Sequence, residues 1–309
     1  MRLLLSDTVL KNLRMCFRNL PFSMLKDIWS FSAFVFLSTV VDMLYWSTDK
    51  VLIGALMGSV AVAVYNVGGV FTSMLQQMTS AISGVFTPRV TMMVVKNATP
   101  QVLSDLLIRI GRLQYLIVAF ILSGYIVFGR IFIHFWSGDE YQDAYIVALL
   151  TMIPLAIPLI QNIAFSIILA QKKHQFRAII YAVIAVINVV TTYLAIPRFG
   201  IIGAAVCTAI AFFLGNGLIM NIYYYRVTKL DIPRFWKNII SMSVVPVTFL
   251  IVGYIIVNKL LPVRGILEFL IEIVIYSILY SVFTWIFTMN TYERNLFLDL
   301  IKRLIPFSR

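Results

Sequence analysis

Long apolar stretches, each able to cross a bilayer, constrain the fold of this chain more than any other feature. They lie at residues 29–57, 60–88, 109–135, 143–171, 176–197, 201–226, 238–259 and 264–288. About 20 apolar residues span the hydrocarbon core as a helix, whereas a β-barrel shows short segments of alternating polarity. The sequence therefore predicts an all-α, polytopic transmembrane helix bundle of about eight transmembrane helices.

Composition supports this class and argues against several functions. Hydrophobic residues make up 61% of the chain, charged residues only 12%, and the net charge of +12 comes from bases between the apolar stretches. Such bases hold membrane topology, so we expect membrane lipids and no nucleic acid as partners. The sequence contains no HExxH, GxSxG or phosphate-binding loop motif. We therefore expect a protein that is not an enzyme and needs no cofactor.

The distribution of Lys and Arg predicts the orientation and the three parts of the chain. With the N-terminus inside, 20 of the 25 basic residues fall on the inner side. This predicts a multi-pass protein of the cytoplasmic (inner) membrane with both termini in the cytoplasm. Residues 1–28 then form a basic amphipathic interfacial segment, residues 29–289 the transmembrane bundle, and residues 290–309 a cytoplasmic amphipathic tail.

Asp42 is the most costly side chain in the first apolar stretch, because it lies near the middle of a predicted membrane helix. One interpretation is a carboxylate that a neighbouring helix merely neutralises. The other is a polar site linked to a cation inside a transporter. A proton on Asp42 itself is the simplest form of such a site.

Polar residues in other helices give further candidates. Gln76, Thr79, Ser80 and Ser83 share one face of the second helix, which either packs against a neighbour or lines a wet cavity. Glu272 lies deep in the last helix. Arg89 either extends to the headgroups or attracts an anionic lipid headgroup.

Residues 187–216 carry a pattern that resembles a known family. An Asn-bearing helix is followed by a Pro-x-x-Gly turn and by Gly-x-x-Gly-Ala-Ala-x-x-Thr, with Asn188, Pro197, Gly200, Gly203 and Thr208 at the key positions. Residues 49–68 and 171–178 add an Asp-Lys pair before a Gly turn and a polar turn. In this order they are similar to the second lobe of lipid-linked oligosaccharide (polysaccharide) flippases, within the multidrug/oligosaccharidyl-lipid/polysaccharide exporter superfamily. The resemblance covers roughly residues 30–290, and it implies the C-terminal lobe of a MATE-like transporter.

The resemblance implies a transporter that moves undecaprenyl-linked oligosaccharide units across the cytoplasmic membrane for surface-polysaccharide or O-antigen biosynthesis. Some members couple transport to a cation gradient, so H⁺ or Na⁺ is an expected partner. A cation site between the first, fifth and sixth helices would here involve Asp42, Asn188, Thr192 and Thr208. Neutral oxygens of this kind suit a hard cation.

The chain departs from the family in helix number, since members usually have twelve to fourteen. We therefore expect a fragment or a half transporter whose first lobe is supplied separately. A drug/cation antiporter of the same superfamily remains an alternative. A polysaccharide polymerase or ligase is a second alternative, although its catalytic residues would need a larger external loop. A non-catalytic scaffold is a third.

Overall fold

The computed structural model describes residues 22–173, 175–257, 263 and 265–304. All regular elements within these ranges are helical, and they follow one another in this order: α2 (Phe22–Met57), α3 (Ser59–Val95), α4 (Pro100–Ser137), the 3-10 turn η2 (Asp139–Tyr141), α5 (Asp143–Ile160), α6 (Asn162–Ala170), α7 (Gln175–Phe212), the π-helix η3 (Phe213–Ile219), α8 (Met220–Arg226), α9 (Ile232–Met242), α10 (Val244–Ile255), α11 (Ile266–Phe283), the π-helix η5 (Thr284–Thr288) and α12 (Thr291–Leu304).

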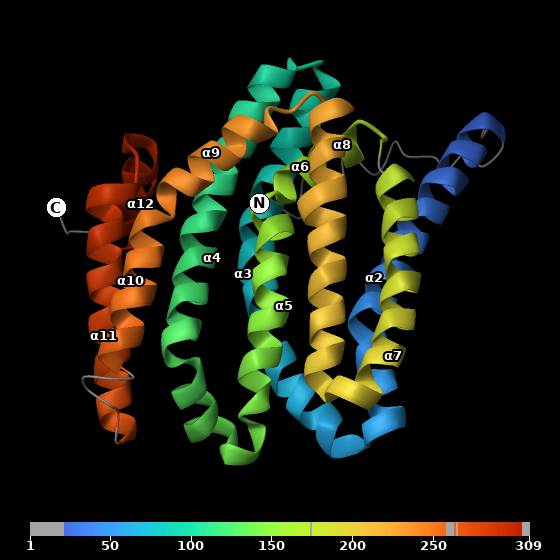
Figure 1. Ribbon diagram of the computed structural model, residues 1–309. Coiled ribbons are helices and arrows are strands. Elements are labelled where there is room, and N and C mark those ends of the chain that lie inside the picture. Colours follow the sequence, from blue (N-terminus) through green and yellow to red (C-terminus); the bar gives the residue numbers. More distant parts are fainter. Residues whose placement is uncertain (1–21, 174, 258–262, 264, 305–309) are drawn as a thin grey trace, which may run out of the picture.

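The described residues contain six helical runs that are long and apolar enough to cross a membrane. They are Ser59–Val95, Pro100–Ser137, Asp139–Ile160, Gln175–Arg226, Ile232–Ile255 and Ile266–Thr288. The protein is therefore a polytopic helical membrane protein, as the sequence predicted. The upright helices lie side by side and leave α9 and α12 at one end of the bundle (Figure 1).

The run Gln175–Arg226 contains two of the predicted helices, joined by a tight reversal. Gly200 has φ 60° and ψ −148°, a backbone conformation that residues with a side chain rarely adopt. Figure 1 shows α7 descending, turning at the lower edge and returning toward α8. The expected break between 176–197 and 201–226 is thus confirmed, and we call its two sides the first and second legs of α7.

Several boundaries differ from the sequence prediction. The first and third predicted helices start earlier than expected, because α2 begins at Phe22, within the predicted interfacial segment 1–28, and α4 begins at Pro100. Pro88 was expected to end the second helix, but α3 continues through it to Val95. A proline inside a helix removes one hydrogen bond, and the burial of Val90 at 0% exposure anchors the turns beyond it. The helix predicted for 238–259 is also wrong at its start, because α9 already begins at Ile232. Asp231 caps it by accepting a 3.0 Å hydrogen bond from the Arg234 backbone N–H.

The fourth predicted helix, 143–171, is divided in the structure by a polar cluster. Gln161 separates α5 from α6 just after Pro158. Its amide donates to the side chain of Asn221 at 2.8 Å, and the Trp236 indole N–H donates to the same oxygen at 2.9 Å. These bonds tie the α5–α6 junction to α8 and α9.

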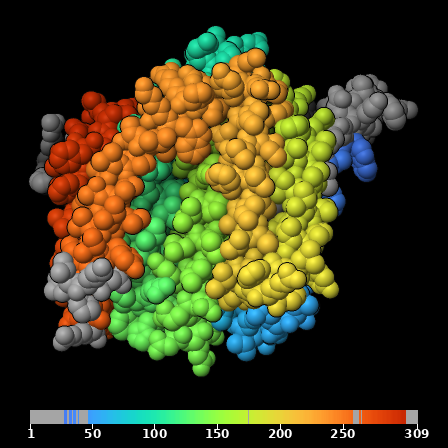
Figure 2. Space-filling view, in the orientation of Figure 1, coloured from blue at the N-terminus to red at the C-terminus, as the bar shows by residue number. Residues whose placement is uncertain are grey.

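A hollow opens on the face drawn in Figure 2, between α9–α10 and the η3–α8 region, with α4 and α5 beneath it. Part of it is a groove of about 400 Å³ lined by α4, α5, α9 and α10. Its lining is mainly apolar. The hydroxyls of Tyr115 and Ser243 meet at 2.5 Å across it and join α4 to the start of α10.

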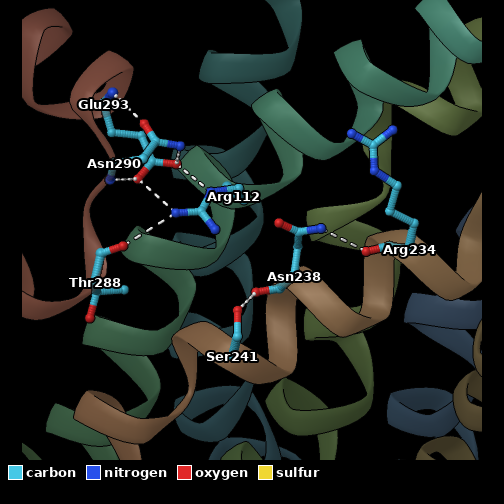
Figure 3. Close-up of polar contacts among 7 residues, drawn as sticks. All are labelled: Arg112, Arg234, Asn238, Ser241, Thr288, Asn290 and Glu293. Atoms are coloured by element: carbon cyan, nitrogen blue, oxygen red, sulfur yellow. Dashed lines mark hydrogen bonds and ion pairs between the residues drawn. The ribbon is translucent and has the colours of Figure 1, made fainter.

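An ion pair holds α12 against α4, and we call it the terminal clamp (Figure 3). The Arg112 guanidinium donates to both carboxylate oxygens of Glu293, at 2.6 and 3.1 Å, and to the Thr288 carbonyl oxygen at 3.2 Å. Glu293 in turn accepts from the backbone N–H of Asn290, while its own N–H donates to the Asn290 side chain. This reciprocal capping starts α12 next to the end of η5.

Candidate functional site

A buried carboxylate, Asp49, lies where α2, α3 and both legs of α7 meet. It is on the last turns of α2 and only 2% exposed. The side chains around it are also buried: Tyr65 from α3, Asn188 and Thr192 from the first leg of α7, and Thr208 from the second leg. We call these five residues the Asp49 cluster.

The hydrogen bonds of the Asp49 cluster converge on one carboxylate oxygen. Oδ2 of Asp49 accepts from the Tyr65 hydroxyl at 2.8 Å and from the Thr208 hydroxyl at 2.6 Å. The Asn188 amide donates to the Thr208 oxygen at 3.2 Å, and the Thr192 hydroxyl donates to the Asn188 amide oxygen at 3.4 Å. The chain of bonds thus links three helices through a single acid.

The other oxygen, Oδ1, is buried without a hydrogen-bond partner. Among the described residues no Lys, Arg or His forms an ion pair with Asp49. Leaving an ionised oxygen buried and unpaired is costly, so the site favours either a proton on Oδ1 or a cation beside it. Carboxylate, amide and hydroxyl oxygens are ligands for hard cations.

A second polar feature is exposed on α3. Ser73, Gln77, Ser80 and Thr91 are exposed, and helical spacing places all four within about 60° of the circumference. Gly84 lies on the same line. We call this line the α3 stripe. Exposed apolar side chains such as Met74, Met78 and Val85 border it on the same helix.

The four residues predicted to share one face of this helix divide between its buried and exposed sides. Thr79 and Ser83 are buried, and the Gln114 side chain of α4 contacts the Ser83 hydroxyl at 2.5 Å. The packing interpretation therefore holds for Thr79 and Ser83. Ser80 belongs to the α3 stripe, and Gln76 lies between the two faces, partly buried.

Residues 8–146 match the model of a family described as "Polysaccharide biosynthesis protein". The matched residues are similar to this family and make up less than half of the chain. Comparison with curated proteins and with solved structures gave no significant match. The matched residues include Asp49, Tyr65 and the α3 stripe.

The expected cation-site residues divide into two groups. The structure brings Asn188, Thr192 and Thr208 together, as the resemblance implied. Asp42 belongs to α2, but its side chain is outside the described part of the chain. The acid that the structure places beside these three residues is Asp49.

The remaining candidates lie apart from the Asp49 cluster. Glu272 lines a groove between α10 and α11. Arg89 is exposed on α3, two turns before the end of the helix because α3 continues to Val95. Residues 1–21 of the predicted interfacial segment 1–28 fall outside the described residues.

Sequence reasoning missed Asp49 and Tyr65 as site residues, although a signal for both was present. Asp49 follows Asp42 by seven residues, which is two helical turns and therefore the same side of α2. Both Asp49 and Tyr65 also lie inside the Asp-Lys and Tyr-bearing pattern of residues 49–68. The sequence alone favoured Asp42 because it lies nearer the middle of the predicted membrane helix than Asp49 does.

Proposed function

We propose that this protein is a membrane transporter, a flippase that moves lipid-linked oligosaccharide units across the cytoplasmic membrane. The observation that carries the proposal is the α3 stripe, taken with the family match. Exposed amide and hydroxyl groups face hydrocarbon at a cost unless water, a polar ligand or protein covers them. A sugar headgroup passing along α3 would find hydrogen-bond partners on Ser73, Gln77 and Ser80, while its lipid stays in the membrane.

We further propose that a second lobe or partner half encloses the α3 stripe. A polar line on one exposed helix face does not by itself form a closed path. A covering surface would complete a wet cavity and leave the bordering Met74, Met78 and Val85 at its edge. Such a surface explains why α3 exposes both polar and large apolar side chains.

The flippase proposal is tested in a flippase-deficient strain that expresses the complete transporter. Gln77→Leu and Ser80→Val are expected to lower polysaccharide export at normal protein levels, because they remove the polar groups of the stripe. Thr191→Val is the matched control, since Thr191 is an exposed hydroxyl among apolar neighbours on α7. Full export by both stripe variants contradicts the proposal. Raised drug sensitivity with unchanged export would favour the drug/cation antiporter.

The Asp49 cluster is proposed as the site where a proton or Na⁺ is coupled to transport. Binding at Oδ1 would change the charge at a point that α2, α3 and both legs of α7 share, and so bias how these helices pack. Asp49→Asn is expected to abolish the dependence of export on the ion gradient. Asp143→Asn, an exposed acid at the start of α5, is the matched control and should retain it.

Cys207 offers a second readout of the Asp49 cluster, because it precedes Thr208 and is partly exposed. With Cys16 replaced by Ser, alkylation of Cys207 should slow in Na⁺ relative to K⁺ if the ion is Na⁺. Asp49→Asn should abolish the difference. No difference in Na⁺, together with gradient-dependent export, would instead assign the coupling to the proton.

We also propose the inner-membrane orientation with both termini cytoplasmic. An arrangement of eight crossings follows if α2 crosses once and the two legs of the Gln175–Arg226 run are counted separately. In this arrangement four crossings precede the α6–α7 junction and four more precede α12, so the two should lie on the same side of the membrane. Figure 1 draws them at the same end of the bundle.

A further inference from the structure

The groove between α10 and α11 differs in shape and chemistry from the features discussed above. Its volume is about 390 Å³, within the range of small-molecule sites. Ile275, Leu279 and Phe283 line it along α11, and Phe249 and Val252 line it along α10. Several of these side chains are largely exposed, so the groove opens to the membrane side of the bundle.

Glu272 stands at one end of this groove, which is otherwise lined mainly by apolar residues with Thr248 and Tyr276. One of its carboxylate oxygens, Oε2, is buried and has no hydrogen-bond partner. Among the described residues no basic side chain forms an ion pair with it. A carboxylate next to hydrocarbon is costly unless it is protonated or meets a cation.

The order of the lining residues matches the order of groups in an amphiphile. Glu272 lies six residues after Ile266, where α11 begins, or about 9 Å along the helix axis. The apolar lining then continues to Phe283, a further distance of about 16 Å. One charged group about 9 Å inside the helix and a long apolar channel beyond it suit a cationic headgroup followed by an alkyl chain.

We propose that this groove binds an aminophospholipid, with the primary ammonium group on Glu272 and an acyl chain along Ile275, Leu279 and Phe283. The ammonium supplies the hydrogen-bond donors and the positive charge that the carboxylate lacks. Phosphatidylglycerol offers hydroxyl donors but no cation to the carboxylate, and its net negative charge would place like charges together. The lipid is therefore selected by its headgroup and held by its chain.

The test uses the purified full chain, reconstituted with equal amounts of phosphatidylethanolamine and phosphatidylglycerol, and counts retained lipids by native mass spectrometry. The wild type should retain phosphatidylethanolamine about fivefold over phosphatidylglycerol, as expected for one partly exposed ion pair. Glu272→Gln should reduce this ratio to about one. Val252→Trp, which fills the groove from α10, should lower retention of both lipids.

Glu268→Gln is the matched control, because Glu268 is on the same helix one turn earlier and does not line the groove. It should keep the wild-type preference. Equal retention of both lipids by the wild type overturns the proposal, and so does an unchanged preference in Glu272→Gln. An equal loss in both Glu variants also overturns it, since the preference would then follow helix charge and not the groove. Size-exclusion profiles confirm that each variant is folded.

Discussion

At the scale of single residues, the Asp49 cluster shows how one acid can be buried at a four-way helix junction. Two hydroxyls donate to Oδ2, and Asn188 orients one of them through its amide. Each of these bonds is formed by a side chain that is itself buried, so water does not replace a lost donor. The charge of Asp49 is therefore sensitive to each neighbour.

Thr208→Val tests this sensitivity without removing the acid. Valine keeps the shape of threonine but loses the 2.6 Å hydrogen bond to Asp49, which should cost about 1–3 kcal/mol of stability because a charged acceptor loses a donor. Export should depend less steeply on the ion gradient in the complete transporter. Thr191→Val, whose hydroxyl bonds only to backbone carbonyls of its own helix, should change neither quantity. A similar gradient dependence in both variants contradicts the role of Thr208.

At the scale of elements, close contacts decide how α4 packs against α9 and α5. A Cβ atom on Gly111 would lie 2.4 Å from the Phe235 ring and 2.8 Å from the Ile160 carbonyl oxygen. The second atom is backbone at the C-terminal end of α5 and cannot rotate away. The absence of a side chain at Gly111 therefore allows α4, α5 and α9 to approach one another closely at this point.

Gly111→Ala is expected to destabilise the bundle by about 1–3 kcal/mol, since it forces Phe235 and α5 to shift. Thermal unfolding in detergent measures the loss. Gly69→Ala on α3 is the control, because a Cβ atom there meets nothing within 4 Å. Equal melting temperatures for the two variants would show that α4 can move away from α9 without cost.

The terminal clamp makes a second prediction at this scale. Glu293 is 1% exposed, so Glu293→Gln leaves the Arg112 guanidinium without its counter-charge and should cost about 3–5 kcal/mol. Asp299→Asn, an exposed acid on the same helix, should leave stability unchanged. Limited proteolysis of the α12 region reports the loss directly. If the α12 region of Glu293→Gln is cleaved no faster than that of the wild type, other contacts hold α12 in place.

At the scale of the whole molecule, the apolar stretches predicted the bundle because hydrocarbon leaves the chain few alternatives to helices. The burial of the polar residues of α3 was predicted less well. Thr79 and Ser80 are adjacent in sequence but lie on different sides of α3, and only the side of Thr79 is covered by neighbouring helices. Thr79 is therefore buried and Ser80 exposed. Asp49 was missed for a similar reason: its donors come from residues 16 and 159 positions away.

Orientation is the prediction that concerns the molecule as a whole. In a chain with Cys16 and Cys207 replaced by Ser, a cysteine at Glu140 should react with an impermeant maleimide in intact cells. A cysteine at Lys173 should react only after the membrane is opened. Both positions are exposed. Glu140 is preferable to the nearby Gly138, because a cysteine would be strained at the φ of 93° that Gly138 adopts. The reverse labelling pattern would invert the proposed topology.

The reversal at Gly200 also determines how this segment enters the membrane during synthesis. Asn188 and Asn216 are amides that an isolated helix would present to lipid, and each pairs with a side chain of the opposite leg: Thr208 for Asn188, and Tyr181 for Asn216. Because the reversal is tight and each amide finds its partner on the opposite leg, we expect the two legs to insert together as a helical hairpin with their amides paired.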